Sequence, residues 1–159
     1  MKLRFSVNGE AVEVEARPDE MLLDVLRRGL DLKSVRQTCG IGVCGTCTAL
    51  VDGEPISTCI LLAPLAASAE ITTVEGLGGT HPVQEAFVEA EAFQCGYCTP
   101  GMILTAKRLL EEDPEPTGEK IRTYLGGNLC RCGCYAKIEV AVRLAANAGK
   151  ATASDGGRA

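Results

Sequence analysis

Aromatic and basic residues are scarce in this 159-residue chain. Tryptophan is absent, aromatic residues make up 4% of the sequence, and Asp and Glu outnumber Lys and Arg, which gives a formal net charge of −5. Proteins that bind nucleic acids usually carry a basic patch together with aromatic side chains that stack on the bases. We therefore expect no nucleic-acid partner.

Long apolar segments are also lacking. The longest apolar run, residues 60–67, contains Pro64 and is far shorter than the roughly 20 residues that a membrane-spanning helix needs. The N-terminus shows no basic segment followed by an apolar stretch and a small-residue cleavage site. We expect no membrane insertion and a cytoplasmic location.

Features of a self-contained enzyme are missing as well. The chain has no G-x-x-x-x-G-K-[ST] phosphate-binding loop, and we expect no Rossmann-type dinucleotide-binding unit. Its one histidine, His81, is expected to be a solvated helix-start residue, because a Rieske-type cluster would need two histidines. Substrate chemistry is therefore expected to take place on another chain.

Cysteine, in contrast, is abundant. The chain has nine cysteines, more than a protein of a reducing compartment uses as disulfides. Bound metal is the better expectation for such a number of thiols.

The N-terminal part has the pattern of a small sheet. Residues 3–16 alternate apolar and polar on either side of Asn8-Gly9, a dipeptide typical of tight hairpin turns. A helix is expected to open at Pro18-Asp19, with Asp19 as its N-cap, and to end at Gly29. These signals predict two antiparallel strands followed by a helix.

The next segments complete this first domain. Residues 48–51 and 55–58 predict a second hairpin around an Asp-Gly turn, and residues 71–74 predict one further strand. A small mixed sheet with one helix is a β-grasp arrangement, and we assign it to residues 1–79.

From residue 82 onward the apolar residues recur at helical spacing. Four helices are predicted, over residues 83–90, 102–110, 117–125 and 136–146, with Thr117 as the N-cap of the third. They would form a helical bundle over residues 80–147, and the Ala-, Gly- and Ser-rich residues 148–159 are expected to be a disordered tail. The predicted fold class is α+β, with a β-grasp domain followed by a four-helix bundle.

The first group of cysteines has a diagnostic spacing. Cys39, Cys44 and Cys47 are spaced C-x4-C-x2-C, and Cys59 follows at the end of the second hairpin. This is the plant-type ferredoxin arrangement for a [2Fe–2S] cluster, and glycines between the ligands let the loop fold tightly around it. Zinc fits less well, because structural zinc sites usually supply their ligands from two short knuckles of similar spacing.

The second group consists of Cys95 and Cys98, spaced C-x2-C, and Cys130 and Cys132, spaced C-x-C. Four thiolates would meet at one end of the bundle, next to helix N-termini whose dipoles offset part of the negative charge. Both a [2Fe–2S] cluster and tetrahedral zinc suit this set, and spacing alone does not separate them.

Three segments carry a resemblance to a known family. Residues 39–47, 94–101 and 127–132 resemble the iron–sulfur subunit of the xanthine oxidase family, which includes xanthine dehydrogenase, aerobic carbon monoxide dehydrogenase and aldehyde oxidoreductases. The resemblance extends from Leu3 to about Ala146. It implies two [2Fe–2S] clusters on this chain.

The resemblance also implies a path for electrons. In this family a molybdenum–pterin (molybdopterin) centre on a large subunit hydroxylates the substrate, and electrons leave through two [2Fe–2S] clusters, usually to FAD on a medium subunit. The second cysteine group would then lie nearest the pterin and the first group nearest the flavin. A dimer of heterotrimers is the expected assembly.

Two residues of the second group are expected to lie at the pterin. By resemblance Gln94 approaches the pterin, and the Cys132 thiolate lies close to the pterin amino group. The alternative for Gln94 is an ordinary polar residue at a helix start. Arg131 would either balance cluster charge or pair with a partner subunit.

The chain departs from the common family pattern after Cys132. The family most often has Thr-Gly-Tyr there, whereas this chain has Gly133-Cys134-Tyr135. A Gly-Thr-Tyr version resembles isoquinoline- and nicotinate-type oxidoreductases, some of which lack a flavin subunit and pass electrons to a cytochrome. Cys134 is expected to be a small buried residue, because eight other thiolates complete two clusters. A free ferredoxin-like carrier and a zinc module are the remaining alternatives.

Overall fold

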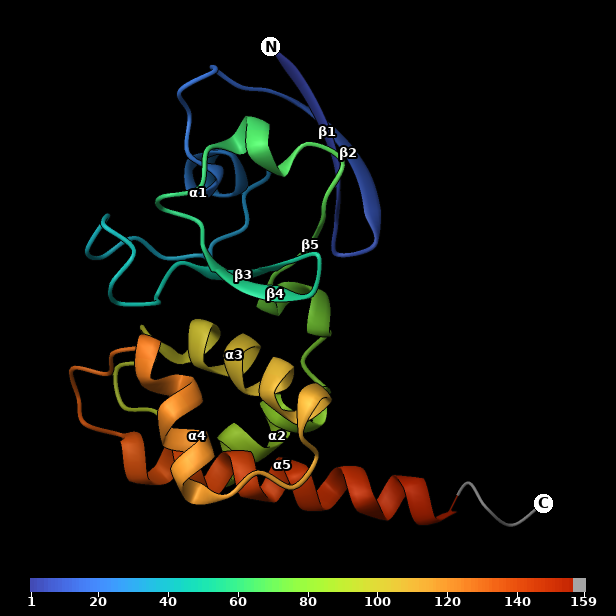
Figure 1. Ribbon diagram of the computed structural model, residues 1–159, viewed down its shortest axis with the longest axis vertical. Coiled ribbons are helices and arrows are strands. Elements are labelled where there is room, and N and C mark those ends of the chain that lie inside the picture. Colours follow the sequence, from blue (N-terminus) through green and yellow to red (C-terminus); the bar gives the residue numbers. More distant parts are fainter. Residues whose placement is uncertain (156–159) are drawn as a thin grey trace.

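The structure is a computed structural model that describes residues 1–155. A sheet unit formed by the N-terminal half and a helical unit formed by the C-terminal half lie end to end along the long axis (Figure 1). The predicted α+β class, with a ferredoxin-like sheet followed by a helical bundle, is confirmed. Among the described residues, no helix is both long and apolar enough to cross a membrane.

The sheet has five strands in the order β2-β1-β5-β3-β4. Their bounds are β1 Lys2–Val7, β2 Glu10–Glu15, β3 Thr48–Val51, β4 Glu54–Ser57 and β5 Glu70–Thr72. Strand β5 is parallel to β1, and the other pairs are antiparallel. The Asn8-Gly9 turn has φ of +52° and +83°, the left-handed values that join two strands through a tight turn.

The first helix begins later than predicted. Helix α1 spans Leu22–Asp24 and continues as a single π-helical turn to Gly29, the predicted end. Asp19 is not its N-cap, because Met21 is extended and forms a β-bridge with Leu62. The pairing of Met21 with Leu62 therefore keeps the residues before Leu22 out of the helix. The Asp19 carboxylate instead accepts a hydrogen bond from Arg17 Nε at 3.2 Å.

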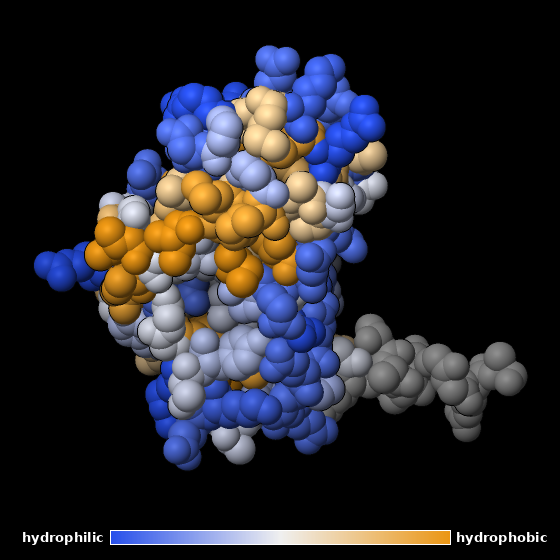
Figure 2. Space-filling model, turned by 45° about the horizontal axis from the view of Figure 1, so that its top comes forward, coloured by the Kyte–Doolittle hydropathy of each residue, from blue (hydrophilic) through white to orange (hydrophobic). Residues whose placement is uncertain are grey.

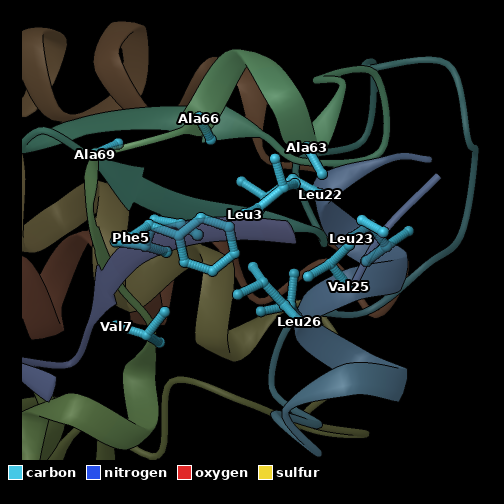
Figure 3. Packing of buried hydrophobic residues seen from close by; sticks show 14 of the residues in the cluster. Leu3, Phe5, Val7, Leu22, Leu23, Val25, Leu26, Ala63, Ala66 and Ala69 are labelled. Carbon is cyan, nitrogen blue, oxygen red and sulfur yellow. The ribbon is translucent and has the colours of Figure 1, made fainter. Parts of the chain in front are cut away.

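The core of the sheet unit follows from strand alternation. Figure 3 shows Leu3, Phe5 and Val7 of β1 directed towards Leu22 and Leu26 of the helical segment, and all five side chains are buried. Side chains two residues apart on a strand share one face, so this face of β1 becomes the floor of the core.

The helical unit contains the four predicted helices. Their bounds are α2 Pro82–Glu89, α3 Thr99–Glu112, α4 Gly118–Tyr124 and α5 Tyr135–Asp155. Thr117 caps α4 by accepting a hydrogen bond from Lys120 N at 3.2 Å, as predicted. His81 lies at the start of α2 as expected, but it is half-buried and its Nδ1 caps the helix by accepting a hydrogen bond from Val83 N at 3.2 Å.

Helix α5 runs beyond Ala146, its predicted end, to Asp155. Alanine is the strongest helix former and recurs along this segment, which favours continuation of the helix. The helix therefore covers residues 148–155 of the predicted tail, and residues 156–159 lie outside the described residues.

Short 3₁₀ turns, which periodicity did not predict, span Ala63–Ala66 and Val74–Leu77. Val74 and Leu77 pack against the core of the helical unit although they precede residue 80. The domain limits at residues 79 and 147 stay predictions.

The two units are in close contact. Helix α3 lies against β3 and β4 (Figure 1), and Arg108 of α3 donates a hydrogen bond to a carboxylate oxygen of Glu54 at 2.5 Å. At the start of α3, a Cβ added to Gly101 would collide with the backbone carbonyl oxygen of Gly45. The absence of a side chain at Gly101 is what lets the units approach.

We therefore expect Gly101→Ala to destabilise the protein by about 1–3 kcal/mol, the usual cost of overpacking a tight contact. Gly126→Ala is the matched control, since an added Cβ there meets no atom within 4 Å. Denaturant unfolding of the two variants measures the difference. Equal stability of the two variants would show that the contact at Gly101 does not hold the units together.

Candidate metal centres

The first group of cysteines surrounds one end of the sheet. Cys39, Cys44 and Cys47 lie in the loop that enters β3, and Cys59 follows β4. Thr58 holds the two strand ends together, because its Oγ1 donates a hydrogen bond to the carbonyl oxygen of Cys47 at 2.7 Å. The thiols of Cys47 and Cys59 contact each other, and so do those of Cys39 and Cys44. The predicted first set is thus brought together.

Backbone N–H groups in this loop point at sulfur. The N–H groups of Ile41, Cys44 and Val43 lower the pKa of the Cys39 thiol to about 6. The three glycines of the loop have positive φ, which makes this tight inward turn of the backbone possible: Gly40 (+68°), Gly42 (+76°) and Gly45 (+68°). The loop is therefore built to stabilise thiolate, the form that binds metal.

Burial has the opposite effect on the other half of this set. Desolvation, followed by the contact with the Cys47 thiol, raises the pKa of Cys59 to about 11. Cys44, Cys47 and Cys59 are buried and Cys39 is half-buried. Thiols bind metal in their deprotonated form, so a bound metal cation would replace the protons of these grouped thiols.

The same loop fits the spacing G-x-G-x-x-G, from Gly40 to Gly45, that occurs in dinucleotide-binding loops. Such loops enter a helix whose N-terminus receives the pyrophosphate. Here the loop enters strand β3 and carries cysteines, so the glycines serve the thiols and not a nucleotide.

The second group lies where helices begin. Cys98 is the N-cap residue of α3, Cys95 lies three residues before it, and Cys130 and Cys132 lie in the loop that leads to α5. The Cys95 thiol contacts that of Cys132, and the Cys98 thiol contacts that of Cys130. The predicted second set is brought together as well.

The pKa values of the second set divide as in the first. Burial and the contact with Cys130 raise the pKa of Cys98 to about 12. The N–H of Tyr97 and the contact with Cys132 lower the pKa of Cys95. For Cys130, burial acts to raise the pKa, but hydrogen bonds, the first of them from the Cys134 N–H, lower it overall.

The pairwise contacts between the thiols suit a cluster with two irons. Within each set the four predicted ligands form two thiol–thiol contacts, and a [2Fe–2S] cluster takes four cysteine thiolates for its two irons. Within residues 1–155, no three His, Cys, Asp or Glu side chains converge on the position of a single metal ion. A cavity of about 450 Å³, with Cys44, Cys98 and Cys130 in its wall, lies between the two sets.

The two sets differ in their exposure. Cys95 and Cys132 are exposed, and Gln94, beside Cys95 in the sequence, is exposed as well. Three of the four thiols in the first set are buried. The second set is therefore accessible from the surface at Cys95 and Cys132, the pair on the same side as Gln94.

Hydrogen bonds join the two sets directly. The N–H of Leu129 donates to the carbonyl oxygen of Cys44 at 2.9 Å, and Leu129 is bonded to Cys130. Buried Asn128 donates from Nδ2 to the carbonyl oxygen of Gly45 at 3.0 Å. Thr105 Oγ1 of α3 orients this amide by donating to Asn128 Oδ1 at 3.0 Å.

Sequence reasoning missed Asn128 and Thr105 as site residues. Asn128 precedes the C-x-C pair by two positions, and its place inside residues 127–132, a segment that resembles the family, was the available signal. Thr105 carries no signal, because a threonine within an amphipathic helix is unremarkable until its partner is known.

Cys134 is more exposed than the buried residue that we expected. It is half-buried, because it stands directly before α5 at the surface. Its N–H points at Cys130 Sγ at 3.4 Å, and burial together with a contact to the Cys130 thiol raises the pKa of its own thiol. Arg131 is exposed and lines the cavity between the sets.

Two domain families match the chain. Residues 5–70 match the 2Fe-2S iron-sulfur cluster binding domain, and residues 73–143 match the [2Fe-2S] binding domain. Each match contains one of the two cysteine sets.

Full-length relatives are similar over nearly the whole chain. A nicotinate dehydrogenase subunit of Pseudomonas putida is 50% identical, with 91% of this chain and 94% of that protein covered. The nicotinate dehydrogenase small FeS subunit of Eubacterium barkeri is 48% identical over 90% of this chain and 93% of that protein. A chain of quinoline 2-oxidoreductase from Pseudomonas putida 86 superposes with a TM-score of 0.90 at 37% identity, covering 95% of this chain and 96% of that one.

Substitutions distinguish the ninth cysteine from the eight predicted ligands. Cys134→Ser should leave both cluster signals intact, because it keeps the backbone N–H that points at Cys130 Sγ. Cys130→Ser, the matched change at a predicted ligand, should abolish the signal of the second cluster. Iron content and electron paramagnetic resonance of the reduced protein measure both. Loss of a cluster in Cys134→Ser would show that the ligand assignment is wrong.

Proposed function

Because this chain belongs to the small iron–sulfur subunits of the molybdenum hydroxylase (xanthine oxidase) family, we propose that it carries electrons away from a molybdopterin centre on a large partner subunit. The chain is an iron–sulfur subunit of an oxidoreductase and contains two [2Fe–2S] binding domains. The large partner and its molybdenum centre are part of the proposal.

Among the eight predicted ligands, we assign the pairs that share an iron by the thiol contacts. In the first cluster Cys39 and Cys44 would hold one iron, and Cys47 and Cys59 the other. In the second cluster the same reasoning pairs Cys95 with Cys132 and Cys98 with Cys130. Each cluster supplies a site for one electron, and the chain's own residues keep both sites close together.

One observation carries the proposal: the hydrogen bond from Leu129 N to the carbonyl oxygen of Cys44. It joins a proposed ligand of the first cluster to the residue bonded to a proposed ligand of the second, Cys130. A free ferredoxin-like carrier would have no use for this connection, since its first domain would suffice. The connection supports a two-step electron path through the chain.

The exposed side of the second set supports a direction for the electron path, from the second cluster to the first. Gln94, Cys95 and Cys132 lie at the surface, where a cofactor on another chain can reach them. We propose that this surface faces the molybdopterin, with Gln94 and the Cys132 thiolate nearest to it. The buried first set would then be the later step.

The first set has its own candidate partner surface. Figure 2 shows apolar residues gathered over one face of the molecule, and the first cysteine loop exposes two large apolar side chains, Ile41 (69% exposed) and Val43 (57%). Exposed apolar surface of this kind marks a protein interface. We propose that a medium FAD-binding subunit covers it, within a dimer of heterotrimers.

A cytochrome is the second candidate acceptor. It is favoured by Gly133 and Tyr135, which match the Gly-Thr-Tyr version expected for nicotinate- and isoquinoline-type enzymes, and by the similarity to nicotinate dehydrogenase subunits. In that case the complex would lack FAD. A cytoplasmic location stays a prediction of the sequence analysis.

Purification of the tagged chain from its host tests the proposal. We expect a red-brown complex with four irons per chain, two distinct paramagnetic species on reduction, and molybdenum in a large co-purifying subunit. Flavin in the complex would identify the FAD path, and haem without flavin the cytochrome path. A colourless protein with bound zinc, or iron without molybdenum or partner chains, would contradict the proposal.

A further inference from the structure

Arg36 is anchored on the first cysteine loop by its backbone. Its N–H donates to the carbonyl oxygen of Thr46 at 3.1 Å, and its own carbonyl oxygen accepts from Thr46 Oγ1 at 3.0 Å. Thr46 lies between two proposed ligands, and its Oγ1 is 3.2 Å from Cys44 Sγ. Val35, immediately before Arg36, is fully buried in the core of the sheet unit. The base of the Arg36 side chain is therefore fixed relative to the first set.

The side chain of Arg36 reaches the other cysteine loop. Its Nη1 donates to the carbonyl oxygen of Gly96 at 2.5 Å, and Gly96 lies between Cys95 and Cys98. The guanidinium group lies over the ring of Tyr97, 5.1 Å from the ring centroid. Both contacts are made with the short segment that supplies half of the second set.

Tyr97 returns the contact. Its hydroxyl group donates to the carbonyl oxygen of Gln37 at 2.9 Å, one residue after Arg36. The two loops are thus tied in both directions, by side chains that are about 60 residues apart in the sequence. Such a reciprocal pair restrains rotation as well as separation.

Resting on the proposed function, we propose that Arg36 is a positioning residue that fixes the placement of the two clusters and puts a positive charge between them. Among the residues that the structure describes, the guanidinium group pairs with a carbonyl oxygen and a ring and not with a carboxylate, so its charge is not neutralised by these partners. Charge-assisted hydrogen bonds and cation–π contacts are stronger than their neutral counterparts. Clusters bound by four thiolates carry negative charge, which this cation would offset.

Magnetic coupling between the clusters tests the positioning role. In the fully reduced complex the spins of two nearby clusters split each other's resonance, and the splitting depends steeply on their separation and orientation. We expect Arg36→Met to retain both cluster signals and four irons, with a reduced or broadened splitting. The midpoint potentials of both clusters should shift downward, because a nearby positive charge favours the reduced form.

Three further variants separate the contributions. Arg36→Lys keeps the charge but not the planar donor over the ring, so the splitting should change while the potentials stay near those of the wild type. Tyr97→Phe removes the bond to Gln37 and keeps the ring, so it should broaden the splitting and leave the potentials in place. Arg143→Met, which removes an arginine paired with Glu139 on α5, should leave both quantities unchanged.

The outcomes keep this inference apart from the proposed function. Wild-type splitting and wild-type potentials in Arg36→Met would overturn the positioning role while the two-cluster function stands. Absence of a second cluster signal in the wild type would overturn the function itself. If Arg36→Met loses a cluster, the splitting is measured in Arg36→Lys and Tyr97→Phe instead. Unchanged splitting in both of these variants would overturn the positioning role of Arg36.

Discussion

The carbonyl oxygen of Gly45 is the most crowded of the points at which the two halves of the molecule meet, since two side chains and the backbone of Gly101 surround it. It accepts hydrogen bonds from Asn128 Nδ2 at 3.0 Å and from Thr48 Oγ1 at 2.8 Å, and the backbone of Gly101 lies directly against it. Buried polar groups must be paired, so these partners cannot separate without cost. Since Gly45 lies within the first cysteine loop and Asn128 beside the second, this contact brings both sets of thiols within reach of each other.

The two sets of cysteines differ in how much of their surroundings this chain supplies. The first loop stabilises the thiolate of its half-buried member, Cys39, through N–H groups such as that of Ile41, whereas burial raises the pKa of the Cys59 thiol. The second set leaves Cys95 and Cys132 exposed, so this chain supplies a smaller part of its surroundings. The first set is therefore more enclosed by this chain than the second.

Local signals in the sequence predicted those structural features that are determined by residues close together in the chain. The Asn8-Gly9 turn and the cap at Thr117 are both determined within a few positions, and the structure contains both of them. The predicted start of α1 was wrong because Met21 pairs with Leu62 across the fold. The bond from Asn128 to Gly45 spans 83 positions, and no periodicity carries information over such a distance. The residues that join the two sets are accordingly the ones that spacing could not identify.

The backbone N–H of Cys134, and not its side chain, explains how the chain can depart from the common family pattern at this position. The group that points at Cys130 Sγ is the backbone N–H of Cys134, held there by the turn at Gly133, whose φ is +74°. A backbone donor is present whatever side chain the position carries, so this position can vary without loss of the hydrogen bond to the thiolate. The turn needs Gly133 more than it needs Cys134, because a side chain at positive φ would be strained. The backbone geometry at Cys130 therefore depends on the glycine at position 133 and not on the side chain at position 134.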